Sequence, residues 1–538
     1  MKMAWLLTLA TLAVAEVAAR GKQLGDARQR LVGEVELIGG DGDVALGKGD
    51  AGNLLQLEIG DVVEDIGEHA DDGGYVCVCM DWWPSNKCDY GLCPWKQSSI
   101  LSVDLENPKL VEAMKGLGEV KLRIGGTQAD TIVYEDGVTP CLPFDPPPGT
   151  NSSFFKHGCL TMKRWDAIVS LCRKAGCSIV FGINAMHGRD KSETRTWDPS
   201  NARALIQHIV RSKQQDVIFG FEYGNELNIN AVNPGLGLTP KQIAEGYHQL
   251  HDLLKAEFGE DNTPKILGPD NIGWQSRYMK KLLSLSKDVL YGVTWHAYPL
   301  GPSYDNPLVD HLVMSPGFHD IFFRRAAKAS KEAKEFGGPD MQIWMGESGG
   351  AFNSGRNNTS NRFLDSFWYL NTMAALAQAG HQSFCRQTLI GGNYELLDKN
   401  SLGPNPDYFA AVMFRKWMGR HVHRVTLSDS SRKIRAYAHC NVKTKIQTIM
   451  VLNFDQNRSA EIDLDHSTHV SPTRDEYHFT APDLHSATVD LNGVTLLHVS
   501  QLKPRVEHDL SRPLALAPQS YAFVVFHNSS CRPAGESR

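Results

Sequence analysis

The stretch that decides the fold is VIFGFEYGNEL at residues 217–227, an apolar run that ends in glycine, asparagine and glutamate. A second stretch, QIWMGESGG at residues 342–350, has the same form, with a glutamate between glycines after the apolar run. Short apolar runs of this kind are typical of buried parallel strands, and the polar residues at their ends are delivered to the loops that follow. The two stretches therefore indicate a parallel α/β fold.

Six further runs precede, separate or follow these two, and most of the intervals contain an amphipathic helical pattern, as in residues 163–175 and 243–258. Eight strands joined by helices favour a closed (β/α)8 TIM barrel, with a doubly wound open sheet as the alternative. The eight expected strands are Val76–Met80, Val120–Ile124, Ser178–Ile183, Val217–Tyr223, Ile266–Gly268, Tyr291–His296, Gln342–Gly346 and Ser383–Ile390.

The 538 residues leave room for more than the barrel, which we place at residues 75–410. From residue 411 to residue 538, short alternating runs without long helical stretches predict a C-terminal β-sandwich domain. Residues 20–74 are rich in Gly, Asp and Glu without sustained periodicity, and we expect no well-specified element there. Residues 1–19 combine Lys2, an apolar run and small residues, which is the pattern of a signal peptide, with an uncleaved anchor as the alternative.

The formal net charge of −6 excludes the basic excess that is typical of nucleic-acid binders, but it leaves room for a local site for one anionic sugar. No other stretch is apolar and long enough to span a bilayer, so membrane association would be peripheral at most. We expect no cofactor and no metal. Cys77, Cys79, Cys88 and Cys93 have irregular spacing for a zinc site.

Cysteines and sequons agree with secretion to the cell exterior or cell wall, with a vacuolar or lysosomal-type destination left open. Eleven cysteines favour disulfides in an oxidising compartment. We expect bridges Cys141–Cys159 and Cys88–Cys93, and we interpret Cys385 as a buried thiol. Five sequons offer sites for N-linked glycans. They begin at Asn151, Asn357, Asn358, Asn457 and Asn528.

Two glutamates, Glu226 and Glu347, follow the fourth and the seventh expected strand. Cleavage of a glycosidic bond needs two carboxyl groups, one to protonate the leaving oxygen and one to attack the anomeric carbon or activate water. If the fold is a barrel, the side chains that leave these two strands can approach each other across its mouth, so both glutamates are catalytic candidates. Asn225 could bind the 2-hydroxyl of a sugar and Tyr298 could orient Glu347. The alternative is that both glutamates are solvated loop charges.

Other polar and aromatic residues gather at the expected strand ends. Arg123 and His296 are candidates for substrate binding, with His296 expected to be fixed by hydrogen bonds. Sugar rings stack on aromatic side chains, although most aromatic residues near the strand ends are expected in the core, Trp344 above all. The aromatic residues concerned are Trp82, Trp83, Trp95, Trp295, Tyr298, Trp344 and Tyr394.

In combination, six motifs resemble the heparanase-like enzymes of glycoside hydrolase family 79, most closely the plant-type branch. The resemblance extends from about Val76 to Phe526 and implies a clan A barrel joined to a β-sandwich, acting on β-linked glucuronic acid with retention of configuration. The motifs are DWWPSNKCDYGLCPW (81–95), LRIGGTQAD (122–130), YGNEL (223–227), VTWHAYPLG (293–301), WMGESGGAFNSG (344–355) and CRQTLIGGNYELL (385–397).

The resemblance implies that Glu226 is the acid/base and Glu347 the nucleophile of a double displacement. It places Tyr298, Gly392 and Tyr394 at the subsite that binds the uronate, where backbone N–H groups around Gly391 and Gly392 could hold the carboxylate. In the family, the segment before the first barrel strand adds a strand to the sandwich. Residues 21–74 do not look like that segment, so the strand is either unrecognisable or replaced by a wrongly assigned exon.

The expected partner is a glucuronic-acid-containing carbohydrate such as an arabinogalactan side chain, a flavonoid glucuronide or a sulfated glycan. Three other functions stay open on the sequence alone. They are a barrel glycosidase of another sugar specificity, an inactive carbohydrate-binding protein, and a transferase that passes the sugar to another acceptor.

Overall fold

A computed structural model describes residues 54–66, 74–142, 144, 158–190, 194–229, 237–304, 306, 308–464 and 472–530. The expected leader at residues 1–19 and the sequon at Asn151 lie outside the described residues. What we expect of them therefore stays a prediction.

Eight parallel strands form a closed barrel, and each expected run overlaps one of them, which confirms the (β/α)8 fold. The barrel closes where the last strand pairs with the first, between Phe384 and Val76. In the order of the chain the strands are β2 (Val76–Asp81), β3 (Lys121–Gly125), β6 (Ser178–Ile183), β7 (Ile218–Tyr223), β8 (Lys265–Ile272), β9 (Gly292–His296), β11 (Gln342–Ser348) and β13 (Ser383–Arg386).

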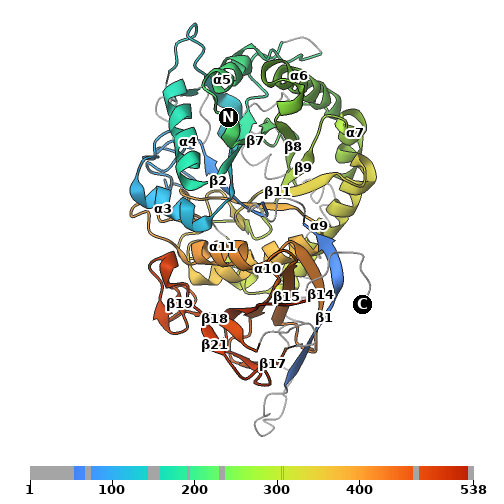
Figure 1. The fold of residues 1–538 in the computed structure, drawn as a ribbon. Coiled ribbons are helices and arrows are strands. Elements are labelled where there is room, and N and C mark those ends of the chain that lie inside the picture. Colours follow the sequence, from blue (N-terminus) through green and yellow to red (C-terminus); the bar gives the residue numbers. More distant parts are fainter. Residues whose placement is uncertain are drawn as a thin grey trace, which may run out of the picture. The chain divides into compact units, whose positions relative to one another are not determined.

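A helix follows each barrel strand, so that the helices surround the strands (Figure 1). The helices are α3 (Pro108–Leu117), α4 (Met162–Ala175), α5 (Ser200–Arg211), α6 (Pro240–Phe258), α7 (Ser276–Ser286), α8 (Val309–Val313), α9 (Pro316–Gly337), α10 (Phe363–Gln378) and α11 (Pro406–Trp417). Short elements lie in the connections: β4 (Ile132–Tyr134), β5 (Gly158–Leu160), β10 (Gly301–Pro302), β12 (Ala351–Phe352), and the 3-10 turns η2 (Thr127–Thr131), η3 (Gln215–Val217), η4 (Glu260–Asn262) and η5 (Val499–Gln501).

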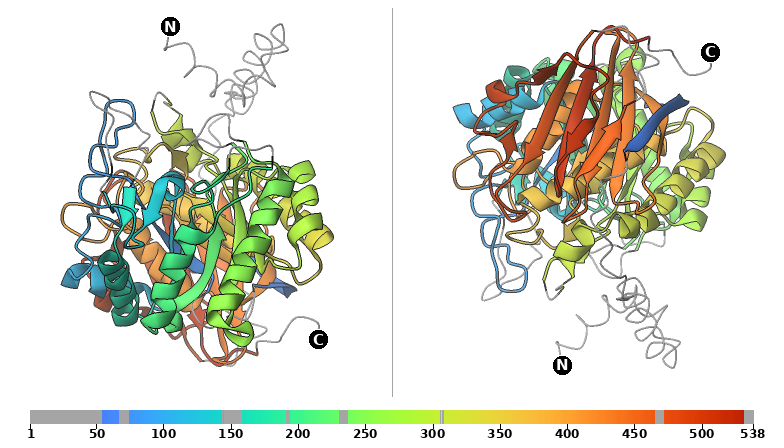
Figure 2. Two further views of the ribbon diagram at one scale, coloured as in Figure 1. Left: turned by 90° about the horizontal axis from the view of Figure 1, so that it is seen from above. Right: turned by 90° about the horizontal axis from the view of Figure 1, so that it is seen from below.

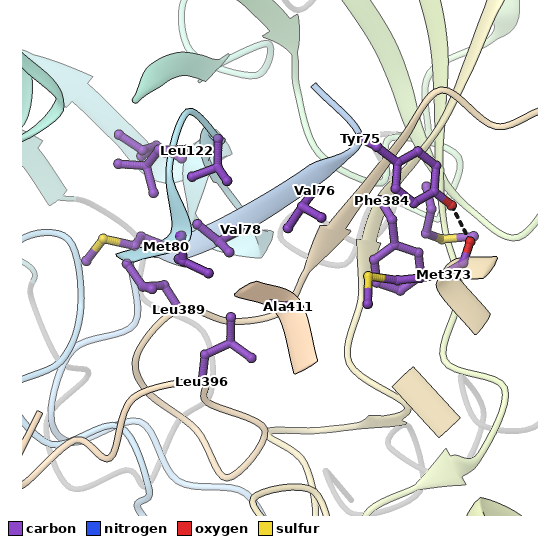
Figure 3. Packing of buried hydrophobic residues seen from close by; sticks show 14 of the residues in the cluster. Tyr75, Val76, Val78, Met80, Leu122, Met373, Phe384, Leu389, Leu396 and Ala411 are labelled. Carbon is purple, nitrogen blue, oxygen red and sulfur yellow. Dashed lines mark hydrogen bonds between the residues drawn. The ribbon is translucent and has the colours of Figure 1, made fainter. Parts of the chain in front are cut away.

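Strand β2 shows how the core is built. Val76, Val78 and Met80 alternate along it and are completely buried, in one cluster with Ala411 of α11 (Figure 3). The hydroxyl of Tyr75, just before the strand, donates to the carbonyl of Met373 in α10 at 2.5 Å. Helix α10 is buried along almost its whole length because it contacts the barrel on one side and strands β1 and β14 of the C-terminal sheet on the other.

The C-terminal part forms a mainly antiparallel sheet, which confirms the expected β-rich domain. A second apolar core, which includes Ile449 and Val524 of the main sheet and Ile462 and Leu514 of β17 and β22, holds two layers together. The strands are β14 (His421–Leu427), β15 (Ile434–Asn441), β16 (Ile446–Asn453), β17 (Ala460–Asp463), β18 (Arg474–Thr480), β19 (Asp490–Leu491), β20 (Val494–Thr495), β21 (Arg505–Glu507), β22 (Leu514–Leu516) and β23 (Ser520–Phe526).

The expectation that residues 20–74 hold no element is wrong for strand β1, Leu55–Asp65. It pairs antiparallel with β14 and, at its first residues, parallel with β17. Figure 2 shows it beside the strands of the C-terminal sheet. Leu55, Leu57 and Ile59 are buried while the residues between them are exposed, so the strand has the period of two that a half-buried strand requires. The family's N-terminal strand is therefore present.

Shortening the buried side chains of β1 is expected to destabilise the sheet. Leu57→Ala should lower the free energy of unfolding by about 3 kcal/mol, because a completely enclosed leucine leaves a cavity behind. Glu58→Ala, on the exposed face of the same strand, is the matched control and should change it by less than about 0.5 kcal/mol. Urea unfolding compares the two. Equal stability of both variants would show that β1 does not belong to the core.

The disulfides confirm two expected bridges and correct the interpretation of Cys385. Cys88–Cys93 and Cys141–Cys159 are bonded. Cys385 is bonded to Cys77 instead of being a free thiol, because their strands β13 and β2 are neighbours at the seam of the barrel. This pairing and the Cys88–Cys93 bridge also rule out zinc binding by the four-cysteine set. A fourth bridge joins Cys172 to Cys177, and Cys440 is bonded as well.

The boundary between the two domains differs from the expected one. Helix α11 runs from Pro406 to Trp417, so a division at residue 410 falls inside it. Within the described ranges, no helix combines the length and the apolar composition that crossing a bilayer requires.

Candidate active site

The barrel brings the two candidate glutamates together. Glu226 follows β7 and Glu347 lies in β11, where the pairing with β9 shifts by one residue. A carboxylate oxygen of each and a ring nitrogen of His296 lie within 4.8 Å of one another. The carboxyl groups, 121 positions apart in the sequence, therefore face one small space at the carboxyl ends of the strands.

Glu347 is held from two sides. The hydroxyl of Tyr298 donates to its Oε1 at 2.5 Å, and Nη1 of Arg123 donates to its Oε2 at 2.9 Å. The contact with Tyr298 is the one expected from the sequence. These two bonds fix the plane of the carboxylate. They also take up lone pairs that a cation between Glu226, His296 and Glu347 would need, so the cluster is better suited to an organic substrate than to a metal.

Arg123 lies behind the carboxylates. Its guanidinium is 1% exposed and donates to Glu222 at 2.8 Å and Asp270 at 3.1 Å as well as to Glu347. Burial alone would lower the pKa of Arg123, but the charges of Glu222 and Asp270 outweigh burial and hold the pKa well above its ordinary value. The N–H donors of Arg123 are engaged within the protein. Its position therefore favours a role in holding the acidic side chains of the site over the direct contact with substrate that was expected.

His296 is completely buried and links two carboxylates. Its Nδ1 lies 3.0 Å from Glu226 Oε1 and its Nε2 lies 3.3 Å from Asp270 Oδ1. Burial lowers the pKa of His296, but Glu347, Asp270 and Glu226 together raise it to about 10. The protonated ring therefore forms an ion pair with Asp270 and donates through Nδ1 to Glu226. His296 is fixed by these contacts, as expected, and its Nδ1 positions the Glu226 carboxyl group.

The backbone before Glu226 turns sharply. Glu226 has φ +49°, which is uncommon for a residue other than glycine, and Gly224 has φ +74°. The N–H of Glu226 donates to the carbonyl of Asp270, and the N–H of Asn225 donates to Asp130. The Asn225 Oδ1 accepts from Arg123 at 3.1 Å, which fixes the amide and leaves its NH2 group as the donor for a ligand.

Tyr394 lies next to Tyr298, which contacts Glu347. Its ring centroid lies 6.5 Å from that of Tyr298 and 6.3 Å from that of Trp95, and the three belong to one aromatic group with Trp83. Burial raises the pKa of the Tyr394 hydroxyl well above its ordinary value, so the phenol keeps its proton.

Gly391 and Gly392 precede Tyr394, and the contacts of Gly391 differ from the expected ones. Gly392 has φ +71°, and a Cβ there would come within 2.7 Å of the Tyr394 ring, so only glycine fits. The N–H of Gly391 donates to Glu395 at 2.9 Å. That N–H is therefore not free to hold the carboxylate of a sugar, which corrects the expectation for Gly391.

Of the aromatic residues considered, Trp344 lies in the core, as expected. It is buried among Val180, Leu267 and Phe219 at a distance from the paired glutamates along the barrel. Trp82, Trp95 and Trp295 are also buried. Trp83 and Tyr394 are buried as well, and Tyr298 is the one residue of this set that is partly exposed.

Several polar residues of the site were not identified from the sequence. Asp81 ends β2 and accepts from Gln387 at 2.9 Å and from the N–H of Trp82 at 2.7 Å. Burial raises its pKa from 3.8 to about 7, and the nearby charge of Glu347 acts in the same direction. The position of Asp81 at a strand end, within a quoted motif, was the signal that could have identified it. Glu222 and Asp270 lie inside strands and give no such signal.

The raised pKa of Asp81 predicts a pH dependence of stability. Folded Asp81 keeps its proton up to a pH of about 7, whereas the unfolded side chain loses it near 3.8, so the folded state binds more protons between these values. The free energy of unfolding should therefore fall as the pH rises through this window. Asp81→Asn removes the effect. Its stability relative to the unmodified protein should rise by up to about 4 kcal/mol between pH of about 4 and about 8.

Urea unfolding of both proteins across this range gives the measurement. Only the difference between the two curves is interpreted, because other groups titrate in both proteins. Parallel curves would contradict a protonated Asp81.

The closed barrel with two glutamates at the carboxyl ends of its strands defines a glycoside hydrolase. The family model described as "Glycosyl hydrolase family 79, N-terminal domain" matches residues 59–374, and the chain belongs to this family.

Two curated relatives cover most of the chain. Heparanase-like protein 3 of Arabidopsis thaliana is 35% identical over 85% of this chain and 90% of its own length. Baicalin-beta-D-glucuronidase of Scutellaria baicalensis is 36% identical over 86% of this chain and 92% of its own length. Among solved structures, a 4-O-alpha-L-rhamnosyl-beta-D-glucuronidase from Fusarium oxysporum 12S has a TM-score of 0.62 at 15% identity, covering 87% of this chain and 99% of that one. That likeness concerns the fold.

Proposed function

We propose that the protein is a retaining β-glucuronidase that cleaves glucuronic acid from a glycan or glycoside, with Glu226 as acid/base and Glu347 as nucleophile. The observation that carries the proposal is the 4.8 Å approach of Glu226, His296 and Glu347. Retaining enzymes place their two carboxyl groups about 5 Å apart, whereas inverting enzymes leave a wider space for water. The named activity of the Scutellaria relative supports glucuronic acid as the sugar.

In the first step Glu347 attacks the anomeric carbon while Glu226 gives its proton to the leaving oxygen. The bond to the aglycone breaks and an ester between Glu347 and the sugar forms. In the second step Glu226 takes a proton from water, whose oxygen attacks the same carbon and releases Glu347. Arg123 and Tyr298 hold the Glu347 carboxylate in place through their hydrogen bonds, and the NH2 group of Asn225 can donate to the 2-hydroxyl of the sugar.

The wall formed by Tyr298, Gly392 and Tyr394 supports recognition of a uronate. A protonated Tyr394 hydroxyl and the N–H of Gly392 are donors that a carboxylate can accept from, with no lysine or arginine needed. Charged hydrogen bonds of this kind separate substrates strongly, because a sugar without the carboxylate leaves buried donors without partners.

A glycoside panel tests this function. We expect kcat/KM for p-nitrophenyl β-glucuronide to exceed the values for the β-glucoside and the β-galactoside by at least about 10²-fold. Equal or greater activity on a neutral glycoside would show that the enzyme prefers that sugar to glucuronic acid and would contradict the proposed specificity. Binding without turnover of any glycoside would support a carbohydrate-binding protein, and sugar transfer to added alcohols in place of hydrolysis would support a transferase.

We also propose that the protein is exported through a cleaved N-terminal signal to the cell exterior or the vacuole, with at most peripheral contact with membranes, and that it carries N-linked glycans. The bonded cysteines support an oxidising compartment. The side chains of Asn357, Asn358, Asn457 and Asn528 are exposed and accessible to a glycosyltransferase. Mass spectrometry of the secreted protein, before and after removal of glycans, tests the leader and the glycans together.

A further inference from the structure

A hollow of about 490 Å³ is lined by residues from several loops, and neither Glu226 nor Glu347 is among them. The loops that follow β2, β9, β11 and β13 form it, which places it at the same end of the barrel as the catalytic candidates. Its volume falls in the range of small-molecule sites, roughly 300–1,000 Å³. The residues used below are Tyr90, Tyr304, Asn306, Asn353, Arg356 and Asn393.

One side of the hollow is a rigid loop. The Cys88–Cys93 disulfide closes it, and Asp89 and Leu92 exchange two backbone hydrogen bonds of 2.8 and 2.9 Å. Tyr90 and Gly91 between them have φ +54° and +82°, the backbone of a tight two-residue hairpin. The bridge and the turn together present the Tyr90 side chain in one orientation without a loss of entropy on binding.

Tyr90 and Tyr304 form an exposed aromatic pair. Their rings are stacked at 4.9 Å with 18° between their planes, yet Tyr90 is 48% and Tyr304 45% exposed. The Nδ2 of Asn353 donates to the Tyr90 hydroxyl at 2.8 Å and fixes the ring further. Exposed, pre-oriented tyrosines offer apolar faces on which sugar C–H groups can stack.

Ser354, which lines the hollow, and Tyr394, which belongs to the catalytic site, both contact Trp95. Ser354 Oγ accepts from Trp95 Nε1 at 2.9 Å and from Lys87 at 3.1 Å, and Trp95 packs edge-on against Tyr394 of the catalytic wall. Asn393, which lines the hollow, is adjacent in sequence to Tyr394. A ligand in the hollow would therefore sit next to the sugar that is cleaved.

The charges of the hollow are balanced by contacts within the protein. Asp89 is paired with Lys87. Arg356 donates to the carbonyl of Asn306 at 2.7 Å and lies 3.8 Å from Asp310. Among the described lining residues, the remaining polar groups are amides and hydroxyls, which match neutral hydroxyl groups.

We propose that this hollow is a binding site for neutral sugar residues of the glycan that carries the glucuronic acid. The proposal rests on the proposed glucuronidase function and extends it: the natural substrate is an oligosaccharide or polysaccharide, held by Tyr90 and Tyr304 while the uronic residue occupies the catalytic cavity. A small aryl glucuronide reaches only that cavity.

The test uses the full chain after enzymatic removal of any N-linked glycan, because Asn357 at the rim begins a sequon. Tyr90→Ala, Tyr304→Ala and the double variant are compared with Ile321→Ala, which shortens a similarly exposed side chain on α9. Tyr90→Phe keeps the ring. Each protein is assayed with p-nitrophenyl β-glucuronide and with neutral galacto-, xylo- and gluco-oligosaccharides that carry one glucuronic acid residue.

We expect the double variant to raise KM for at least one of these oligosaccharides by about 10-fold or more, which corresponds to the loss of stacking on two rings. The kinetic constants for the aryl glucuronide, the Tyr90→Phe variant and the Ile321→Ala variant should stay within about 2-fold of the unmodified protein. Unchanged KM for every oligosaccharide, or an equal loss on the aryl glucuronide, would overturn the proposal.

A calorimetric titration separates this proposal from the glucuronidase function. The same neutral oligosaccharides, without the glucuronic acid residue, are added to the unmodified protein and to the double variant. No bond is cleaved in this experiment. Binding that the double variant loses supports the site even if no glucuronide is hydrolysed. Absence of binding for the whole panel, or binding that both proteins share, overturns it even if glucuronides are hydrolysed.

Discussion

Glu347→Ala is expected to lower kcat/KM for an aryl glucuronide on the order of 10⁵-fold, the largest effect of any single change in this chain. The loss follows because Glu347 is the nucleophile of the proposed double displacement, and alanine cannot form the ester with the sugar. The protein should stay folded, since Tyr298 and Arg123 would face the cavity and water could satisfy them. Circular dichroism verifies the fold, and stopped assays of aryl glucuronide hydrolysis verify the loss.

Glu226→Ala is the matched comparison. Loss of a general acid costs about 10² to 10⁴ in rate, and less when the leaving group is a good one. Azide is an anionic nucleophile that needs no general base, so it should restore turnover in this variant by attacking the sugar–Glu347 ester. Azide should not rescue Glu347→Ala in the same way. Near-normal activity of either variant without azide would contradict the assignment of both glutamates.

Arg123→Met is expected to be the most destabilising change, by about 3–5 kcal/mol at neutral pH. Methionine fills part of the space, but the buried acidic groups of Glu222, Asp270 and Glu347 would lose the guanidinium that pairs with all three, and His296 would be the cation left beside Asp270. Burial raises the pKa of Asp270, and at present the charge of Arg123 outweighs burial and holds the pKa well below its ordinary value. The stabilisation that this pairing supplies is present above the unfolded pKa and is lost as the pH falls through the folded one.

The difference in stability between Arg123→Met and the unmodified protein should therefore shrink as the pH is lowered below about 4. Arg173→Met is the control, since Arg173 makes two hydrogen bonds with Asp216 at an exposed position. It should cost at most about 1 kcal/mol. Urea unfolding measures both variants. A deficit for Arg123→Met no larger than that for Arg173→Met would contradict the central place of Arg123.

The barrel could be predicted from the sequence because its strands contain short apolar runs, several of which lead into polar residues. Strand β1 was missed although Leu55, Leu57 and Ile59 alternate with exposed residues, because the Gly- and Asp-rich sequence on both sides masks a single alternating run. The bond between Cys77 and Cys385 was missed for a different reason. Those strands meet only when the barrel closes, and spacing along the chain carries no information on closure.

In the site, too, the sequence predicts some features and leaves others to the folded structure. Glu226, Glu347 and Tyr298 stand at strand ends, where the sequence marks them, and their contacts agree with expectation. Arg123 was found for the same reason, but its contacts with Glu222 and Asp270 cross the barrel interior and depend on side-chain packing. A sequence pattern shows which residues leave a strand, and it does not show whether they point to the substrate or to each other.

The central claim is that Glu347 forms a covalent bond with the sugar. The most direct measurement is to incubate the protein with 2-deoxy-2-fluoro-β-glucuronosyl fluoride, which slows hydrolysis of the ester, and to map the adduct by peptide mass spectrometry. We predict a single fluoroglucuronosyl adduct on Glu347, within the peptide that contains WMGESGG (residues 344–350). An adduct on another residue, or turnover with inverted configuration and no adduct, would contradict the account.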